Sequence, residues 1–289
     1  RECDSEDIFI AEKDNTVVVK ADDANFTIQS NIAEDFFSIE DIKTDFEISV
    51  SRSRLERMIN QTIFTSGRET MAYTFEGILF NVSENSLEIV GTDGKRIAIS
   101  SETCRGGKTA EGKDTRFLVP LSSLRILLNI TGVSSDENVT LRFSENYIIF
   151  VDSSTELRSQ LIEGRFPEYR NYIPDSYGVT SIFSREKLVS GLRKADIMTS
   201  QETHLVTFSF SGEDNVCTLT AKCLDRGTSE VTVPMESYEG EDITVGFDAR
   251  HLLDVLRVVE EEKITWKIKE DQGPGEITEN ETYKYVFMP

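Results

Sequence analysis

The chain is 289 residues long, 38% hydrophobic and 29% charged, with a formal net charge of -21. This length exceeds one ordinary hydrophobic core, so it predicts two or three domains. No apolar run approaches the roughly 20 residues of a membrane-spanning helix, and residues 1–10 lack a signal-peptide pattern, so we expect a cytoplasmic protein without membrane contact. The acidity by itself argues against a nucleic-acid partner, because phosphate binding relies on Lys and Arg.

The sequence offers no clear catalytic or metal-binding constellation. Its four cysteines form no CxxC pair and have no histidine at zinc-ligand spacing. GxSxG, HExxH, P-loop and GxGxxG motifs are absent, and His204 and His251 are the only histidines. Paired carboxylates at 241–242 and 260–262 are interpreted as solvated surface. We therefore expect no enzyme, no catalytic residue, no cofactor and no metal.

The first segment, residues 1–44, contains two strand-like runs, Thr16–Lys20 and Phe26–Ser30, and then an acidic connector. Its apolar content is too small to close a core by itself. We interpret it as the C-terminal part of an incomplete domain.

From residue 45 onward one unit recurs four times, an apolar strand that runs directly into a helix opened by a capping or turn residue. The last strand residues of the copies lie 69, 64 and 64 positions apart, which is an internal repeat; they are Val50, Val119, Phe183 and Phe247. Apolar residues at i, i+3 or i+4 give each helix one buried stripe, so the helices are predicted to lie on sheets.

Short alternating runs bounded by Gly, Asn, Asp and Ser separate these units and predict antiparallel strands, for example 87–90, 139–143, 147–151, 205–210, 216–221 and 264–268. Between two such strands, Thr92–Gly94 predicts a tight turn in which Asp93 bonds its own backbone and the glycine takes a positive φ. The turn would present Lys95 and Arg96 at the edge of a sheet, where they could bind a partner. The whole pattern predicts an α+β fold of repeated domains, each with two helices on one side and antiparallel sheets on the outside.

The charge is distributed unevenly. The four predicted helices carry ten basic and five acidic residues, a net +5, so the total of -21 leaves -26 for the rest of the chain. Ordinary mixed surface charge is one interpretation. The other is that the helices share one face and meet a polyanion through its phosphates, without base readout.

Four motifs resemble the bacterial DNA polymerase III beta subunit, the replicative sliding clamp. They are TDGKRIA at 92–98, EGRFPEYRNYIP at 163–174, GFDARHLLDVL at 246–256 and YVFMP at 285–289. They occur in that family's order and at nearly its spacing, from about Phe46 onward. The resemblance implies the DNA-clamp fold, in which two three-domain subunits close a ring with helices around the hole and sheets outside.

The resemblance also implies the domain organisation. Residues 1–44 would be the C-terminal part of clamp domain I, residues 45–176 the central domain II, and residues 177–289 domain III. We expect an N-terminally truncated chain, with roughly 75 to 80 further residues encoded upstream, an estimate from the domain repeat. At full length it would form a homodimeric ring.

The implied function is that of a DNA polymerase processivity factor. Such a ring encircles duplex DNA and contacts its backbone independently of sequence. It tethers the DNA polymerase III alpha subunit, the clamp loader and repair proteins, which bind through linear peptide motifs. The residues that would face DNA are Arg52, Arg54, Arg57, Arg125, Lys187, Arg193, Lys194 and Arg250.

By the same resemblance, a hydrophobic cleft between domains II and III would receive the partner peptide. Its residues would be Phe75, Thr92, Gly94, Lys95, Arg96, Ile97, Pro167, Asn171, Tyr172, His251, Val286, Met288 and Pro289. Two of these depart from the family pattern: Asn171 stands where a basic residue is usual, and Lys95 where histidine is common.

The alternative is a secreted, acidic, β-rich binding protein without a DNA role. Six N-x-S/T sequons would carry glycans in such a protein, at Asn25, Asn60, Asn81, Asn129, Asn138 and Asn280. This alternative explains the sequons and the acidity, but it does not explain the basic helices.

Overall fold

The computed structural model describes residues 7–13, 15–21, 24–30, 42–66, 76–106, 115–131 and 137–289. The chain divides into two compact units, Arg1–Lys43 and Thr44–Pro289. The first unit holds one antiparallel sheet in the order β1 (Phe9–Lys13), β2 (Thr16–Lys20) and β3 (Asn25–Gln29). Its large apolar side chains are mostly exposed, as expected for a segment with too little apolar material for its own core.

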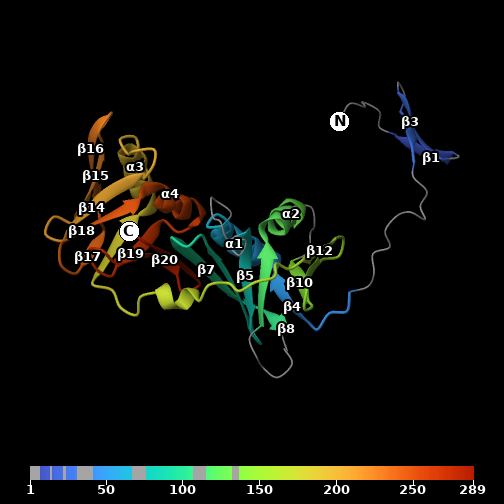
Figure 1. Ribbon diagram of the computed structural model, residues 1–289, viewed down its shortest axis with the longest axis horizontal. Coiled ribbons are helices and arrows are strands. Elements are labelled where there is room, and N and C mark those ends of the chain that lie inside the picture. Colours follow the sequence, from blue (N-terminus) through green and yellow to red (C-terminus); the bar gives the residue numbers. More distant parts are fainter. Residues whose placement is uncertain are drawn as a thin grey trace. The chain divides into compact units, whose positions relative to one another are not determined.

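The second unit is built from four strand-to-helix units, so the predicted fourfold repeat is confirmed. The pairs are β4 (Phe46–Ser51) with α1 (Arg52–Ile63), β9 (Thr115–Pro120) with α2 (Leu121–Thr131), β13 (Val179–Ser184) with α3 (Arg185–Asp196), and β18 (Ile243–Asp248) with α4 (Ala249–Val258). Figure 1 shows these helices along one side of the unit's strands. We call residues 45–176 the α1/α2 half and residues 177–289 the α3/α4 half.

The helix starts differ from the expected capping pattern. Asp248 caps α4 by accepting a hydrogen bond from the Arg250 N–H at 2.8 Å, but Ser51 and Ser184 make no side-chain cap bond to α1 and α3. The first N–H groups of those two helices donate instead to strand-side carbonyls, Arg52 to Glu137 at 2.9 Å and Arg185 to Glu262 at 2.8 Å. Because each strand leads straight into its helix, neighbouring backbone satisfies these donors.

The remaining strands are antiparallel, as predicted. They are β5 (Gly77–Val82), β6 (Ser86–Thr92), β7 (Arg96–Thr103), β8 (Arg105–Gly106), β10 (Asn138–Phe143), β11 (Tyr147–Val151), β12 (Glu156–Gln160), β14 (Leu205–Ser211), β15 (Val216–Cys223), β16 (Gly227–Pro234), β17 (Ser237–Glu239), β19 (Lys263–Ile268), β20 (Gly275–Asn280) and β21 (Tyr283–Phe287). A single-turn 3-10 helix, η4 (Tyr169–Tyr172), interrupts the connector between the halves.

Three sheets organise the second unit. A five-stranded sheet, β12-β11-β10-β4-β8, belongs to the α1/α2 half, and a four-stranded sheet, β16-β15-β14-β18, belongs to the α3/α4 half. The third has nine strands in the order β17-β13-β19-β20-β21-β7-β6-β5-β9. It passes from one half into the other where β21 pairs with β7, from Tyr283 opposite Ser100 to Phe287 opposite Arg96.

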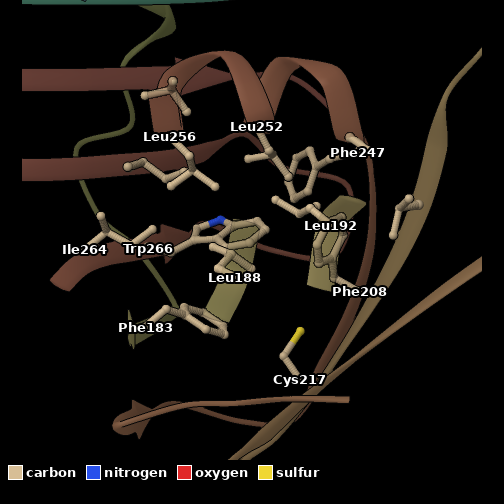
Figure 2. Close-up of a cluster of buried hydrophobic side chains, with 14 of the residues drawn as sticks. Phe183, Leu188, Leu192, Phe208, Cys217, Phe247, Leu252, Leu256, Ile264 and Trp266 are labelled. Atoms are coloured by element: carbon tan, nitrogen blue, oxygen red, sulfur yellow. The ribbon is translucent and has the colours of Figure 1, made fainter. Parts of the chain in front are cut away.

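Each half has its own core beneath its helices. In the α1/α2 half, Leu55, Met58 and Ile59 of α1 are buried against strand side chains. In the α3/α4 half the centre is Trp266, which is fully buried. Figure 2 shows it between Phe183 and the α4 leucines. Its ring centroid lies 5.0 Å from Phe208, in an edge-on contact that adds to the burial energy.

Candidate functional site

The turn between β6 and β7 has the predicted geometry. Asp93 Oδ1 accepts hydrogen bonds from the N–H groups of Lys95 at 3.0 Å and Arg96 at 3.1 Å, and Thr92 Oγ1 accepts one from the Gly94 N–H at 3.1 Å. Gly94 has a φ of 89°, which glycine adopts without the penalty of a Cβ. Side-chain acceptors therefore fix the loop from within.

Arg96 does not stand at the rim as predicted, because it is only 3% exposed. Its Nε donates to Asp93 Oδ2 at 2.9 Å, its Nη1 to Asp254 Oδ2 at 3.0 Å, and its Nη2 to the Phe64 carbonyl at 3.2 Å. Burial lowers the pKa of Arg96, but Tyr285, Asp93 and Asp254 raise it by more, so the guanidinium stays charged. This residue joins the turn to the C-terminal end of α1 and to the middle of α4.

A cavity of about 160 Å³ opens beside this turn. Three segments line it: the turn, the connector between the halves, and the end of β21 with the residue after it. The Met288 N–H donates to the Lys95 carbonyl at 2.9 Å, so the C-terminal segment is held against the turn. The lining residues are Thr92, Gly94, Lys95, Arg96, Ile97, Pro167, Tyr169, Tyr172, Val286 and Met288.

Nine of these ten residues belong to the cleft inferred from the sequence. Phe75 lies outside the described residues, and Asn171, His251 and Pro289 do not line this cavity. The backbone of His251 still lies nearby, because its carbonyl accepts a hydrogen bond from the Tyr285 hydroxyl at 3.0 Å. Burial, and then the charge of Arg96, lower the pKa of the His251 ring.

The lining residue that the sequence analysis missed is Tyr169, which is 2% exposed. Its hydroxyl bonds to the Glu88 carboxylate, which also accepts from Arg170 Nη2 at 3.0 Å. Burial and then Glu88 raise the pKa of Tyr169 to about 12. The 3-10 turn explains its position, since side chains at i and i+3 of such a turn eclipse and Tyr172 also lines the cavity, but the sequence analysis did not predict this turn.

The basic residues of α3 are the most available of the predicted DNA-facing set. Lys187, Arg193 and Lys194 are exposed, and no ion pair holds them among the described residues. The same is true of Arg125 on α2. Arg250 is exposed but lies 3.4 Å from the carboxylate of Asp248.

Arg52 is not available to an external partner. Its Nη2 lies 2.9 Å from Asp152 Oδ2, and both side chains are less than 10% exposed. Burial raises the pKa of Asp152, but the N–H groups of Ser154 and Thr155 and the Arg52 guanidinium outweigh it and lower this pKa from 3.8 to about 2. The expectation that Arg52 faces DNA does not fit this arrangement.

Arg54 and Arg57 share one carboxylate on β7. Arg54 Nη1 lies 3.0 Å from Glu102 Oε2, and Arg57 Nη2 lies 2.5 Å from Glu102 Oε1. These residues line a polar groove of about 440 Å³, together with Ser53 and with Glu260 from the other half. The groove therefore contains as many acidic as basic side chains.

The described part of the chain shows neither a metal site nor a membrane-spanning helix. No three His, Cys, Asp or Glu side chains there gather as metal ligands. None of the described helices is both long and apolar enough to cross a membrane.

Comparisons with known families identify both halves. Residues 49–168 match the central domain of the DNA polymerase III beta subunit, and residues 170–289 match its C-terminal domain. The beta sliding clamps of Chlamydia muridarum and Chlamydia trachomatis are each 28% identical to this chain over 264 residues. Those matches span 91% of this chain, but only 70% and 62% of the two relatives.

The fold is shared with solved structures of the same family. The DNA polymerase III beta subunit of Pseudomonas aeruginosa superimposes with a TM-score of 0.89 at 24% identity, covering 98% of this chain and 76% of that one. The beta subunit of Thermotoga maritima gives 0.89 at 23% identity, with 100% and 77% covered. The predicted DNA-clamp architecture is thereby confirmed.

Proposed function

The chain belongs to the DNA polymerase III beta subunit family, and on this basis we propose that it is a DNA polymerase processivity factor. It acts as a sliding clamp of the bacterial cytoplasm, which encircles duplex DNA and tethers the polymerase without catalysing a reaction. The observation that carries this proposal is the pair of consecutive family matches, which together take in residues 49–168 and 170–289. Family membership gives no support to the alternative of a secreted acidic binding protein.

The cavity beside the turn supports a peptide-binding role. Ile97, Pro167, Val286 and Met288 supply apolar surface, and a few such anchors carry most of the energy of a peptide complex. A methionine adapts to several side-chain shapes, which suits a cleft that serves the DNA polymerase III alpha subunit, the clamp loader and repair proteins in turn. Lys95 is the exposed cation of the lining, since Arg96 is neutralised internally, so Lys95 is the residue to meet an acidic side chain of the peptide.

The helix side supports contact with DNA. Lys187, Arg193 and Lys194 extend from α3 into solvent, and Arg125 does so from α2. Lys and Arg side chains that contact only phosphates bind DNA of any sequence equally well, and these contacts weaken as the salt concentration rises. Such contacts permit sliding, and the acidic remainder of the chain disfavours DNA elsewhere on the surface.

The edge of the four-stranded sheet supports a homodimeric ring. β16 ends that sheet and has no described strand on its outer side. The Ser229 hydroxyl of β16 donates to the Ala195 carbonyl at 3.3 Å, which holds the C-terminal end of α3 beside this edge. Ile197, two residues further, is 63% exposed. An open strand edge beside an exposed isoleucine is a surface suited to a second subunit.

Met288→Ala tests the cleft. Loss of this apolar anchor should weaken binding of a fluorescein-labelled peptide from a DNA polymerase III alpha subunit by about 1 to 3 kcal/mol, measured by anisotropy. Met198→Ala is the matched control, because Met198 packs on the α3/α4 core and does not line the cavity. Equal affinity of the Met288→Ala and wild-type proteins would show that the peptide binds elsewhere.

A further inference from the structure

The polar groove beside α1 contains one carboxylate that forms ion pairs with two arginines. Glu102 accepts both Arg54 and Arg57, one on each carboxylate oxygen, from positions i and i+3 of α1. The three side chains differ in exposure: 8% for Glu102, 32% for Arg57 and 52% for Arg54. The carboxylate is therefore fixed on a strand, while the outer guanidinium extends into solvent.

This arrangement removes most of the positive charge that α1 contributes to the helix side. Arg52 is already paired with Asp152, and Glu102 offsets one of the two remaining arginines. Glu260 also lines the groove, so the net charge of its four charged side chains is zero. A neutral patch attracts a phosphate backbone far less than two free arginines do.

We propose that Glu102 is an internal counterion of the DNA-facing surface, which competes with DNA phosphates for Arg54. The inference rests on the proposed DNA-binding function and specifies how strongly α1 takes part in it. A DNA phosphate binds Arg54 after the Arg54–Glu102 ion pair breaks. The long arginine side chain can turn outward toward the phosphate, whereas the buried carboxylate stays in place. Arg57 stays behind and keeps the carboxylate paired.

The exchange has a physical reason in the strength of the competing contacts. The guanidinium of Arg54 is half exposed, and ion pairs with a solvent-exposed partner are weak, so a phosphate can replace this contact at little cost. Arg54 returns to the fixed carboxylate just as easily once the phosphate moves away. Each contact made by Arg54 is thus brief and weak, as a surface that moves along DNA requires.

Glu102→Gln tests this proposal, because it removes the counterion and keeps the shape and hydrogen-bonding capacity of the side chain. The expected result is tighter binding to a fluorescein-labelled 30-base-pair duplex, by about threefold to tenfold at 20 mM KCl, measured by anisotropy. The slope of log affinity against log salt concentration should steepen by about 0.9, the value for one additional phosphate contact. Loss of a merely structural contact would not strengthen binding.

A double-mutant cycle shows whether the gain passes through Arg54. Arg54→Gln alone should change DNA affinity by less than about twofold, since Arg54 is already paired with Glu102. In the Glu102→Gln background, the same Arg54→Gln substitution should abolish most of the increase in DNA affinity. Glu47→Gln is the matched control. It removes the same charge from a more exposed pair, with Arg142 at 3.2 Å. Glu47 alternates with the buried Ile48 and therefore lies on the sheet face away from the helices.

Each outcome decides the matter. If reversal of the α3 charges weakens DNA binding while Glu102→Gln leaves affinity and salt slope unchanged, the counterion proposal is wrong and the clamp function stands. Equal gains in Glu102→Gln and Glu47→Gln would also overturn it, since the effect would then be one of net charge. If the duplex binds no variant, and α3 reversal has no effect either, the DNA-binding function fails and the counterion role fails with it.

Discussion

The two helix pairs of residues 44–289 share one architecture but differ in how their positive charge is held. All three arginines of α1 are paired with carboxylates of their own half, Asp152 and Glu102. On α3, Lys187, Arg193 and Lys194 have no ion pair among the described residues. The number of basic residues on α1 therefore overstates the positive charge that this helix has available for DNA. Of these two helices, α3 provides the unpaired positive side chains.

The difference comes from the strands on which the helices lie. Beside α1, β7 carries Glu102 within reach of two arginines. Beside the end of α3, β16 carries Ser229, whose neutral hydroxyl bonds a backbone carbonyl and leaves Arg193 and Lys194 unpaired. The carboxylate on β7 thus offsets charge on α1, whereas Ser229 of β16 offsets none on α3.

Reversal of the α3 charges should have the largest effect on this comparison. Arg193→Glu with Lys194→Glu removes two phosphate contacts, and at 50 mM salt the affinity for a 30-base-pair duplex should fall on the order of a hundredfold. The slope of log affinity against log salt should flatten by about 1.8. Titrations of a labelled duplex at several salt concentrations measure both quantities.

The matched control for this experiment is Arg116→Glu with Lys284→Glu, which changes the same net charge on strands of the nine-stranded sheet. A loss of similar size in the control would mean that overall charge, and not the α3 surface, sets DNA affinity.

Arg52→Gln should separate stability from DNA binding. It leaves Asp152 buried without its cation, and loss of one partner of a buried pair destabilises a protein by about 3 kcal/mol. We expect a lower unfolding midpoint in urea but unchanged duplex affinity. A marked loss of DNA binding by the folded variant would return Arg52 to the DNA-facing set.

Acid should weaken the same pair in a defined range. The folded-state pKa of Asp152 is depressed from 3.8 to about 2, so its contribution to stability is complete above about pH 4 and is lost as pH falls through about 2. The stability difference between wild type and Asp152→Asn should therefore shrink between pH 4 and pH 2. Urea unfolding at fixed pH values measures this difference, and a constant value would show that the pair does not titrate there.

Much of the fold could be predicted from local sequence patterns. The four strand-to-helix units have the 3.6-residue apolar period next to short strands, and this pattern depends only on near neighbours. The turn at Asp93 and Gly94 was equally predictable, because its hydrogen bonds span two or three residues.

The state of the charged residues could not be predicted in this way. Arg96 pairs with Asp254 across 158 positions, and Arg52 pairs with Asp152 across 100. Nothing local distinguishes these arginines from exposed ones such as Arg193, so the sequence alone assigned all three to the surface. For the cleft, the family resemblance supplied most lining residues, whereas Tyr169 required knowledge of the 3-10 turn.

The junction of β21 with β7 has a mechanical consequence. Five residue pairs in register, from Tyr283 with Ser100 to Phe287 with Arg96, make the nine-stranded sheet continuous across both halves. Strands joined in this way cannot hinge or slide without breaking several hydrogen bonds at once. The two halves should thus move together at this seam, and any gate that admits DNA must open at another joint.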